Sequence, residues 1–263
     1  MKKIIFTIVV LICALGIVLL VNRQNATSET IKIGVIAPLT GPGAIFGTSL
    51  VKSIELSLQD LKSTKYKYEL IIEDDGTNPA QSASAASKLV NVDKVKAIIT
   101  ATSGTGNSVA PIAEAAKIPH ICTACADKKV ATGKYNYTST IQVEEEAKVF
   151  IDYAIKTGSK SLGLLSQIHP GINAVADAVK AEATKQSLPI VYEERYDGNN
   201  RDFKTIITKA IEAKADVYFI QAFPPTLDIV GQELKTKGVK NIAGGAGAFF
   251  IAADPKIFEG TWL

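Results

Sequence analysis

The chain has 263 residues, of which 47% are hydrophobic and 21% are charged, and its formal net charge at pH 7 is +3. This apolar content is enough for one large domain or two smaller ones, and it excludes a disordered chain. The positive charges are interspersed with glutamates and form no basic block, so the composition argues against a nucleic-acid partner.

The N-terminal segment has the pattern of an export signal. Lys2 and Lys3 precede an uncharged apolar run over residues 4–21. Such a run is long enough to reach across most of a bilayer core, and no small-residue cleavage site follows it. We therefore favour an uncleaved signal anchor over a cleaved signal peptide within residues 1–23. Everything after Asn22, beginning with a tether at residues 24–30, is then expected outside the cytoplasm.

From Ile31 onward, short β-branched runs alternate with segments of helical periodicity, which indicates parallel sheets built from βαβ units. Strands are predicted at 31–37, 68–73, 95–99, 118–122, 161–165, 190–196, 217–222 and 241–243, with a further candidate at 135–143. Helices are predicted around 50–61, 79–90, 110–117, 144–156, 172–186, 202–213 and 227–237. The predicted fold class is α/β, with two doubly wound parallel-sheet lobes at residues 31–143 and 144–263.

Residues 101–108 combine hydroxyl side chains with glycines between a predicted strand and a predicted helix. A loop of this kind presents hydroxyls and unpaired backbone N–H groups at a helix N-terminus, where the helix dipole favours an anion. We expect it to hold a small molecule with a carboxylate or similar group. Ligands of open parallel sheets bind beyond the carboxyl ends of the strands. The other candidate loops at these ends are 41–47, 123–127, 167–171, 223–226 and 244–248.

Catalytic and cofactor interpretations have weaker support. Ser103 has no G-x-S-x-G surroundings, so a ligand hydroxyl is favoured over a helix cap or a nucleophile. The glycines at 41, 43 and 47 lack the spacing of a dinucleotide fingerprint. We therefore predict neither an enzyme nor a bound cofactor.

His120, Cys122 and Cys125 form a cluster with three possible interpretations. Thiols without a catalytic role are favoured. A disulfide between the two cysteines is the second interpretation, because an exported chain meets an oxidising compartment. A metal site is the third option, but it lacks a fourth ligand, since His169 belongs to the second predicted lobe.

Several landmarks follow one another in a characteristic order. They are residues 31–42 with Phe46 and Gly47, residues 73–76 with Asn78 and Pro79, residues 111–114, Asp202 and Phe203 before residues 215–218, and finally Glu259 and Gly260. With these landmarks, residues 31–263 resemble the type I periplasmic binding proteins of the branched-chain amino acid class. Such proteins usually continue well beyond this length, so the resemblance implies an incomplete first lobe.

The resemblance implies a function and its partners. The expected protein is an extracytoplasmic binding protein that clamps a small molecule between two lobes and delivers it to an ABC permease in the membrane. The same fold also serves as the ligand-sensing ectodomain of membrane receptors, which is the alternative.

The resemblance also implies ligand-binding positions. Phe46 falls at the aromatic rim of the cleft, Ser103 at the hydroxyl that reads a carboxylate, and Phe223 at the aromatic wall of the other lobe. Ala124 and Ala126 fall where backbone groups and a side-chain hydroxyl serve the ligand. The neighbouring residues Gly104, Thr105 and Cys125 complete this part of the predicted site.

Three positions depart from the family pattern. Ala126 lacks the hydroxyl, Pro170 stands where an aromatic residue is common, and Ala246 stands where amino-acid binders carry the acid for the ligand's ammonium. An ammonium buried without a counter-charge costs several kcal/mol. Either the ligand lacks an α-ammonium, or an acid outside the mapped positions supplies the charge.

Overall fold

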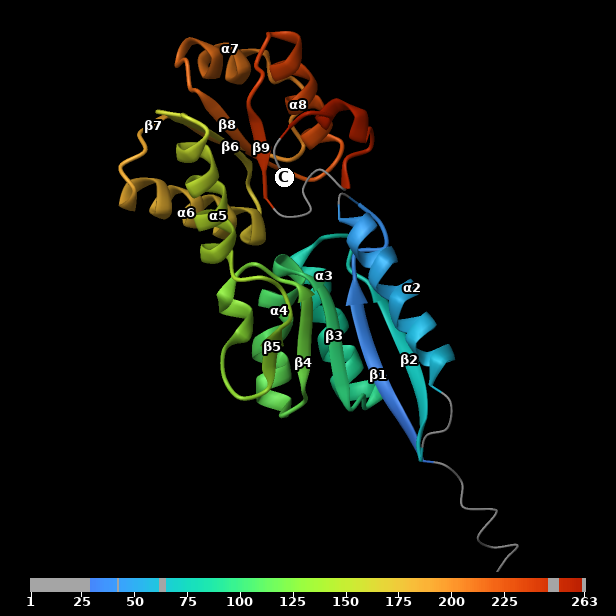
Figure 1. Ribbon diagram of the computed structural model, residues 1–263. Helices are drawn as coiled ribbons and strands as arrows, with labels where there is room; N and C mark the ends of the chain where they lie inside the picture. The colour runs from blue at the N-terminus through green and yellow to red at the C-terminus, as the bar shows by residue number, and fades with distance from the viewer. Residues whose placement is uncertain (1–28, 42, 62–64, 246–250, 262–263) are drawn as a thin grey trace, which may run out of the picture.

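The computed structural model describes residues 29–41, 43–61, 65–245 and 251–261. It contains a five-stranded sheet of order β2-β1-β3-β4-β5 and a four-stranded sheet of order β7-β6-β8-β9. All strand pairs are parallel. Figure 1 shows the two sheets in separate lobes, with the carboxyl end of β1 directed towards the second lobe. The predicted α/β fold with two parallel-sheet lobes is confirmed.

The first lobe is built from β1 (Thr30–Ala37), α2 (Ala44–Asp60), β2 (Lys67–Asp74), α3 (Pro79–Lys88), η1 (Leu89–Asp93), β3 (Ala97–Thr102), α4 (Ser103–Ala116), β4 (His120–Ala124), η2 (Lys128–Ala131) and β5 (Asn136–Thr138). The second contains α5 (Val143–Lys156), β6 (Leu162–Gln167), α6 (Pro170–Lys185), β7 (Ile190–Tyr196), α7 (Lys204–Glu212), β8 (Val217–Gln221), α8 (Thr226–Thr236), β9 (Ile242–Gly244) and η4 (Pro255–Phe258). No helix among the described residues has the length and apolarity needed to cross a membrane. The predicted anchor at residues 4–21 lies outside the described residues.

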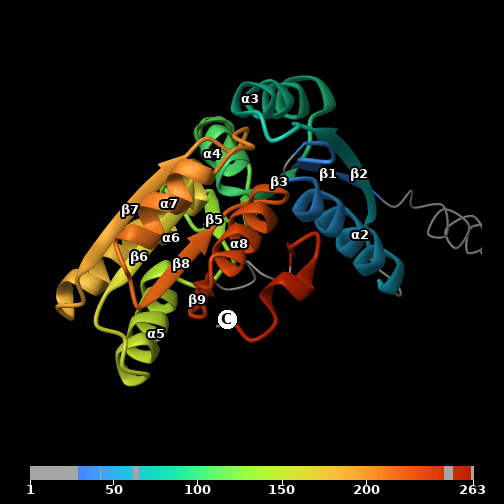
Figure 2. The same cartoon turned by 90° about the horizontal axis from the view of Figure 1, so that it is seen from above.

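Each sheet is covered by helices on both faces (Figure 2). Successive strand residues point to opposite faces, so Leu164 packs into the core under α5 and α6 while Leu165 packs into the core under α7 and α8. The first lobe divides in the same way: Val35 lies in the cluster under α2, and Ile36 in the cluster with α3 and α4. Strands buried on both faces explain the continuous β-branched runs of the sequence.

The start of α3 agrees with the sequence prediction. Asn78 is the N-cap, and its side chain accepts hydrogen bonds from the backbone N–H groups of Ala80 at 2.9 Å and Gln81 at 3.4 Å. Pro79 occupies the first helical turn, where its missing N–H costs nothing.

The prediction of a loop over residues 101–108 is wrong, because α4 begins at Ser103. Thr102 caps this helix, with its Oγ1 3.4 Å from the backbone nitrogen of Thr105. The glycines that suggested a loop serve close packing instead. A Cβ at Gly106 would lie 3.0 Å from both sulfurs of Cys122 and Cys125.

The candidate strand at residues 135–143 is confined to β5, Asn136–Thr138. The next residues leave the first sheet and lead into α5, the first helix of the second lobe (Figure 1). A segment that crosses between lobes cannot continue the hydrogen-bonding ladder of either sheet, which explains the shorter strand.

Candidate functional site

A cavity of about 130 Å³ lies between the two lobes, beyond the carboxyl ends of their strands. Its wall includes five of the residues predicted for the ligand site: Phe46, Ser103, Ala124, Ala126 and Phe223. The first four belong to the first lobe and Phe223 follows β8 of the second. The topology therefore brings to one cavity residues as distant in the chain as Phe46 and Phe223, which are 177 positions apart.

Aromatic rings close one side of this cavity. The rings of Phe46 and Phe223 meet edge to face, with centroids 5.7 Å apart. The ring of His169 packs on Phe223 at 4.9 Å. Phe223 is itself buried, and its backbone N–H donates to Oε1 of Gln167 at 2.9 Å. The lobes are therefore in direct contact through side chains on their facing ends.

Ser103 stands at the first position of α4 and is buried. Its Oγ lies 3.2 Å from the backbone nitrogen of Asp127, from which it accepts a hydrogen bond. A hydroxyl that accepts one hydrogen bond keeps its own hydrogen for donation. Together with the positive end of the α4 dipole, this donor favours an anionic group in the cavity.

Three other predicted residues do not line the cavity. Thr105 faces into the first lobe, where its Oγ1 donates to Oδ2 of Asp75 at 2.6 Å. Gly104 lies against the ring of His169, with 3.0 Å between Nε2 and the place where a Cβ would stand. Cys125 is buried in a cluster with Cys122 and Val130. Ala246 lies outside the described residues.

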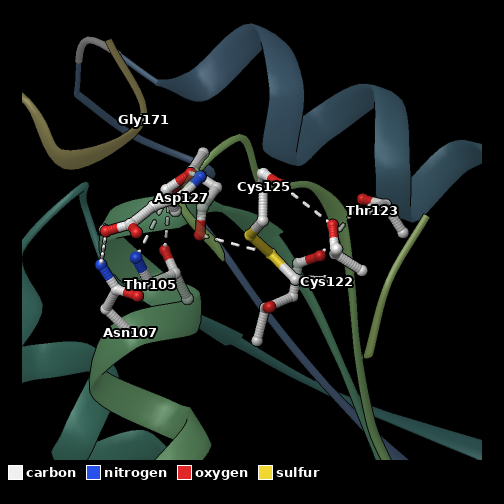
Figure 3. The surroundings of a disulfide bond; sticks show 12 residues. Thr105, Asn107, Cys122, Thr123, Cys125, Asp127 and Gly171 are labelled. Carbon is white, nitrogen blue, oxygen red and sulfur yellow. Dashed lines mark hydrogen bonds between the residues drawn. A yellow bond between two sulfur atoms is a disulfide. The ribbon is translucent and has the colours of Figure 1, made fainter. Parts of the chain in front are cut away.

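Cys122 and Cys125 form a disulfide across the end of β4, with their Cα atoms 5.6 Å apart. Figure 3 shows the bond beside the first turns of α4, with Thr105 and Asn107 on that helix. The favoured interpretation of two unbonded thiols is thus wrong, and the disulfide alternative is right. The spacing of the cysteines was a signal in the sequence, since two cysteines three residues apart in an exported chain can form a disulfide. Spacing alone does not reveal whether their Cβ atoms face each other, and this decides whether the bond forms.

The metal interpretation of this cluster has no support from the described residues, among which no group of three or more potential ligands is poised for a metal. His120 is instead a core residue, with Nε2 2.8 Å from Thr100 Oγ1 and Nδ1 2.8 Å from Asn136 Oδ1. Burial lowers the pKa of His120, which keeps its imidazole neutral.

Besides Thr102 and Thr140, the predicted site omits three polar residues of the cavity wall: Glu146 on α5, His169 before α6, and Gln221 at the end of β8. Two of them lie in or beside predicted strand-end loops, because His169 belongs to 167–171 and Gln221 precedes 223–226. Glu146 gave no such signal, since it occupies the first turn of an amphipathic helix.

Glu146 and Gln221 lie together at one end of the cavity. Their side-chain Oε1 atoms both approach Gly245, where a Cβ would collide with them. Gln221 Oε1 also accepts a hydrogen bond from the Gly245 backbone N–H at 2.9 Å. Two acceptor oxygens therefore lie beside Gly245, on the part of the wall that we call the acceptor end, and Ser103 on α4 marks the donor end.

His169 is the N-cap of α6, and its Nδ1 accepts a hydrogen bond from the backbone N–H of Gly171 at 3.2 Å. Its Nε2 is buried and has no hydrogen-bond partner among the described residues. Burial lowers the pKa of His169 to about 4. The imidazole is therefore neutral, with its hydrogen on Nε2.

The sequence model of the family described as periplasmic binding protein matches residues 30–255. The chain belongs to this family. The resemblance drawn from the ordered landmarks is confirmed, and with it the type I fold of the branched-chain amino acid class.

Among curated members of the periplasmic binding protein family, the chain is similar to Leu/Ile/Val-binding protein homolog 3 of Brucella melitensis, with 28% identity over 236 residues. That alignment covers 86% of this chain and 64% of the relative. Leu/Ile/Val-binding protein BraC3 of Rhizobium johnstonii is 26% identical over 226 residues, covering 82% of this chain and 61% of the relative. The chain thus spans less than two thirds of the length of these relatives.

Solved structures of periplasmic binding proteins share the fold. The leucine-binding protein LivK of Thermotoga maritima superposes with a TM-score of 0.79 at 22% identity, covering 88% of this chain and 66% of the other. A solute-binding protein of an ABC transporter from Rhodopseudomonas palustris, in complex with 3,4-dihydroxybenzoic acid, gives a TM-score of 0.74 at 24% identity, covering 82% and 61%.

Proposed function

We propose that this periplasmic binding protein captures a small solute between its lobes, outside the cytoplasm, and delivers it to an ABC permease without chemical turnover. The observation that carries the proposal is the cavity bounded by both lobes, on whose wall Phe46, Ser103 and Phe223 converge. Membrane attachment through residues 4–21 and the lobe boundary between residues 143 and 144 remain predictions.

The donor end of the cavity supports a carboxylate-bearing solute. Ser103 Oγ and the N-terminus of α4 both favour negative charge there. The names of similar proteins agree with this chemistry, because leucine, isoleucine, valine and dihydroxybenzoic acid all carry a carboxyl group. The apolar wall around Ile172, Val175 and Phe223 would then cover the body of the solute.

The acceptor end supports a cationic nitrogen on the same solute. Ala246 cannot supply a counter-charge, but Glu146 lines the cavity from α5 and lies outside the positions that the family resemblance mapped. Of the two alternatives left by the sequence, we therefore favour an acid in a different place over a solute without an ammonium. The proposed solute is small and zwitterionic, with its carboxylate at Ser103 and its ammonium at Glu146.

A thermal-shift and calorimetric screen of the full chain in a nonionic detergent tests this proposal. Matched probes are leucine and valine, their analogues without the amine (4-methylpentanoate and 3-methylbutanoate), leucinamide and 4-hydroxybenzoate. A solute at 100 times its dissociation constant adds about 2.7 kcal/mol to the free energy of unfolding. We expect the zwitterions to stabilise the protein more than their analogues.

Two substitutions connect a hit to the cavity. Ser103→Ala is expected to weaken binding at least about tenfold, in line with the loss of a hydrogen bond to a charged group. Glu146→Gln should weaken the binding of zwitterions but leave the binding of the analogues without the amine unchanged. Ser108→Ala is the matched control, because Ser108 lies on α4 and its hydroxyl bonds to the Gly104 carbonyl within the helix. Unchanged affinity in Ser103→Ala would contradict the proposed placement of the solute carboxylate at Ser103.

A further inference from the structure

We propose that His169 is a positioning residue whose side chain must be uncharged when the two lobes close, so that its protonation in acid opens the cavity. The proposal rests on the contact between the lobes and requires no particular solute.

The ring of His169 lies on the surface where the lobes meet. It belongs to the second lobe, where it packs on Phe223 at 4.9 Å. Its Nε2 faces Gly104 of the first lobe, 3.0 Å from the position that a Cβ would occupy. Separation of the lobes therefore uncovers this nitrogen, and closure buries it.

The hydrogen bond at Nδ1 requires the neutral ring. Nδ1 accepts from the backbone N–H of Gly171 at 3.2 Å and thereby caps α6. A neutral imidazole has one acceptor nitrogen, whereas an imidazolium has donors on both. Protonation of His169 would put an N–H against the N–H of Gly171 and remove the cap.

Nε2 of His169 has no partner within the described part of the chain that would stabilise the protonated ring. Nε2 is buried and has no hydrogen-bond partner among the described residues, so closure leaves a charged ring without solvation there. The N-termini of α4 and α6 both lie beside the ring, and their dipoles oppose a positive charge.

Carboxylates near the ring are the groups that would favour protonation. Glu146 on α5 shares the cavity with His169, and Asp197 after β7 shares a neighbouring groove between the lobes. Asp127 approaches Ser103 through its backbone, but its carboxylate accepts from Asn107 Nδ2 at 2.7 Å. Burial is the cause of the lowered pKa of His169, and it outweighs these charges.

The direction of the pH effect follows from the two protonation equilibria. In the closed form the pKa of His169 is about 4, and in an open form the exposed ring returns towards its ordinary value of about 6.5. The open form thus binds more protons. The closed form is fully favoured above about pH 6.5 and loses its advantage as the pH falls towards 4. Between pH 8 and pH 5, the closure equilibrium is expected to fall by up to about 30-fold, and by less where the Gly171 cap, which lies within the second lobe, still opposes protonation in the open form.

Hydrogen exchange of the full chain in detergent, read by mass spectrometry between pH 4.5 and 8, tests this coupling. After correction for intrinsic exchange, protection in the first turns of α4 and α6 should drop together in acid, with a midpoint between about 4 and 6.5. The ring titration of His169 by NMR gives its pKa directly, and His120 provides an internal comparison, because the chain has only two histidines.

His169→Asn separates proton sensing from capping, because an asparagine oxygen caps a helix but does not titrate in this range. This variant should keep its protection across the pH range. Asp197→Asn is the control and should retain the wild-type step. A step that persists in His169→Asn, or a His169 ring in the wild type that titrates at or above about 6.5, would overturn the proposal. Neither outcome depends on whether a solute binds, so the proposed function is judged separately.

Discussion

Two glycines determine how closely the lobes approach each other. Gly171, in the first turn of α6, faces Ser103, and a Cβ at this position would stand 2.7 Å from the serine Oγ. Gly104, in the first turn of α4, faces His169 in the reciprocal arrangement. Each lobe therefore contributes a glycine opposite a polar side chain of its partner, and neither φ angle is positive. These glycines serve close approach and not backbone freedom.

Gly171→Ala is expected to impair closure while leaving the second lobe folded. The added methyl group collides with Ser103 only when the lobes meet, whereas alanine within a helix is favourable by about 1 kcal/mol over glycine. Affinity for a solute identified in the screen should fall at least about tenfold. A tenfold loss corresponds to about 1.4 kcal/mol of binding free energy. The free energy of unfolding in urea, measured without solute, provides the control and should not decrease. Unchanged affinity would show that the lobes close differently.

At the scale of elements, the first turns of α4 are tied to the ends of two strands of the first sheet. Thr105 Oγ1 donates to the fully buried carboxylate of Asp75, which also accepts from Ser82 Oγ at 2.6 Å. The disulfide packs against the same helix at Gly106. The strand-end residues of β2 and β4 thus hold the first turn of α4, and with it Ser103, in one orientation.

Thr105→Val is expected to lower the free energy of unfolding by about 1–3 kcal/mol. The substitution keeps the volume of the side chain but removes a donor from a buried carboxylate. Urea unfolding measures the effect. Thr208→Val on α7 is the matched control, because the Thr208 hydroxyl only bonds to the Lys204 carbonyl on an exposed helix face. Equal losses in the two variants would contradict an anchoring role for the Asp75 contact.

At the scale of the whole molecule, each lobe has cores of its own. The clusters under α5, α6, α7 and α8 contain residues of the second sheet, and those under α2, α3 and α4 contain residues of the first. The contacts between lobes include the side chains around Phe46, Ser103 and His169, with the Lys128–Glu144 ion pair and Ala126, which packs on the core of the second lobe. Such an arrangement favours two units that unfold separately.

Calorimetry of the full chain is therefore expected to show two transitions. Ile98→Ala in β3 should lower one of them and Leu164→Ala in β6 the other, because both side chains are fully buried and each cavity costs about 2–5 kcal/mol. Each variant serves as the control for the other. A single transition that both substitutions lower equally would show that the lobes unfold as one unit.

The sequence by itself determined the order of strands and helices, the parallel sheets and the family. Hydrophobic periodicity and turn residues are local properties, so the bounds of β7 and the cap of α3 at Asn78 could be predicted from neighbouring residues alone. The family resemblance also named Phe46, Ser103 and Phe223, which the fold brings to one cavity.

Only the tertiary structure decided where α4 begins, that Cys122 and Cys125 are joined, and that Glu146 and His169 line the cavity. In the sequence alone, glycines near a helix start indicate a loop. Only the structure shows that a neighbouring side chain leaves no room for a Cβ there. An acid on an amphipathic helix is indistinguishable from a surface charge until another lobe covers it. These features depend on contacts between residues far apart in the chain, which no local pattern encodes.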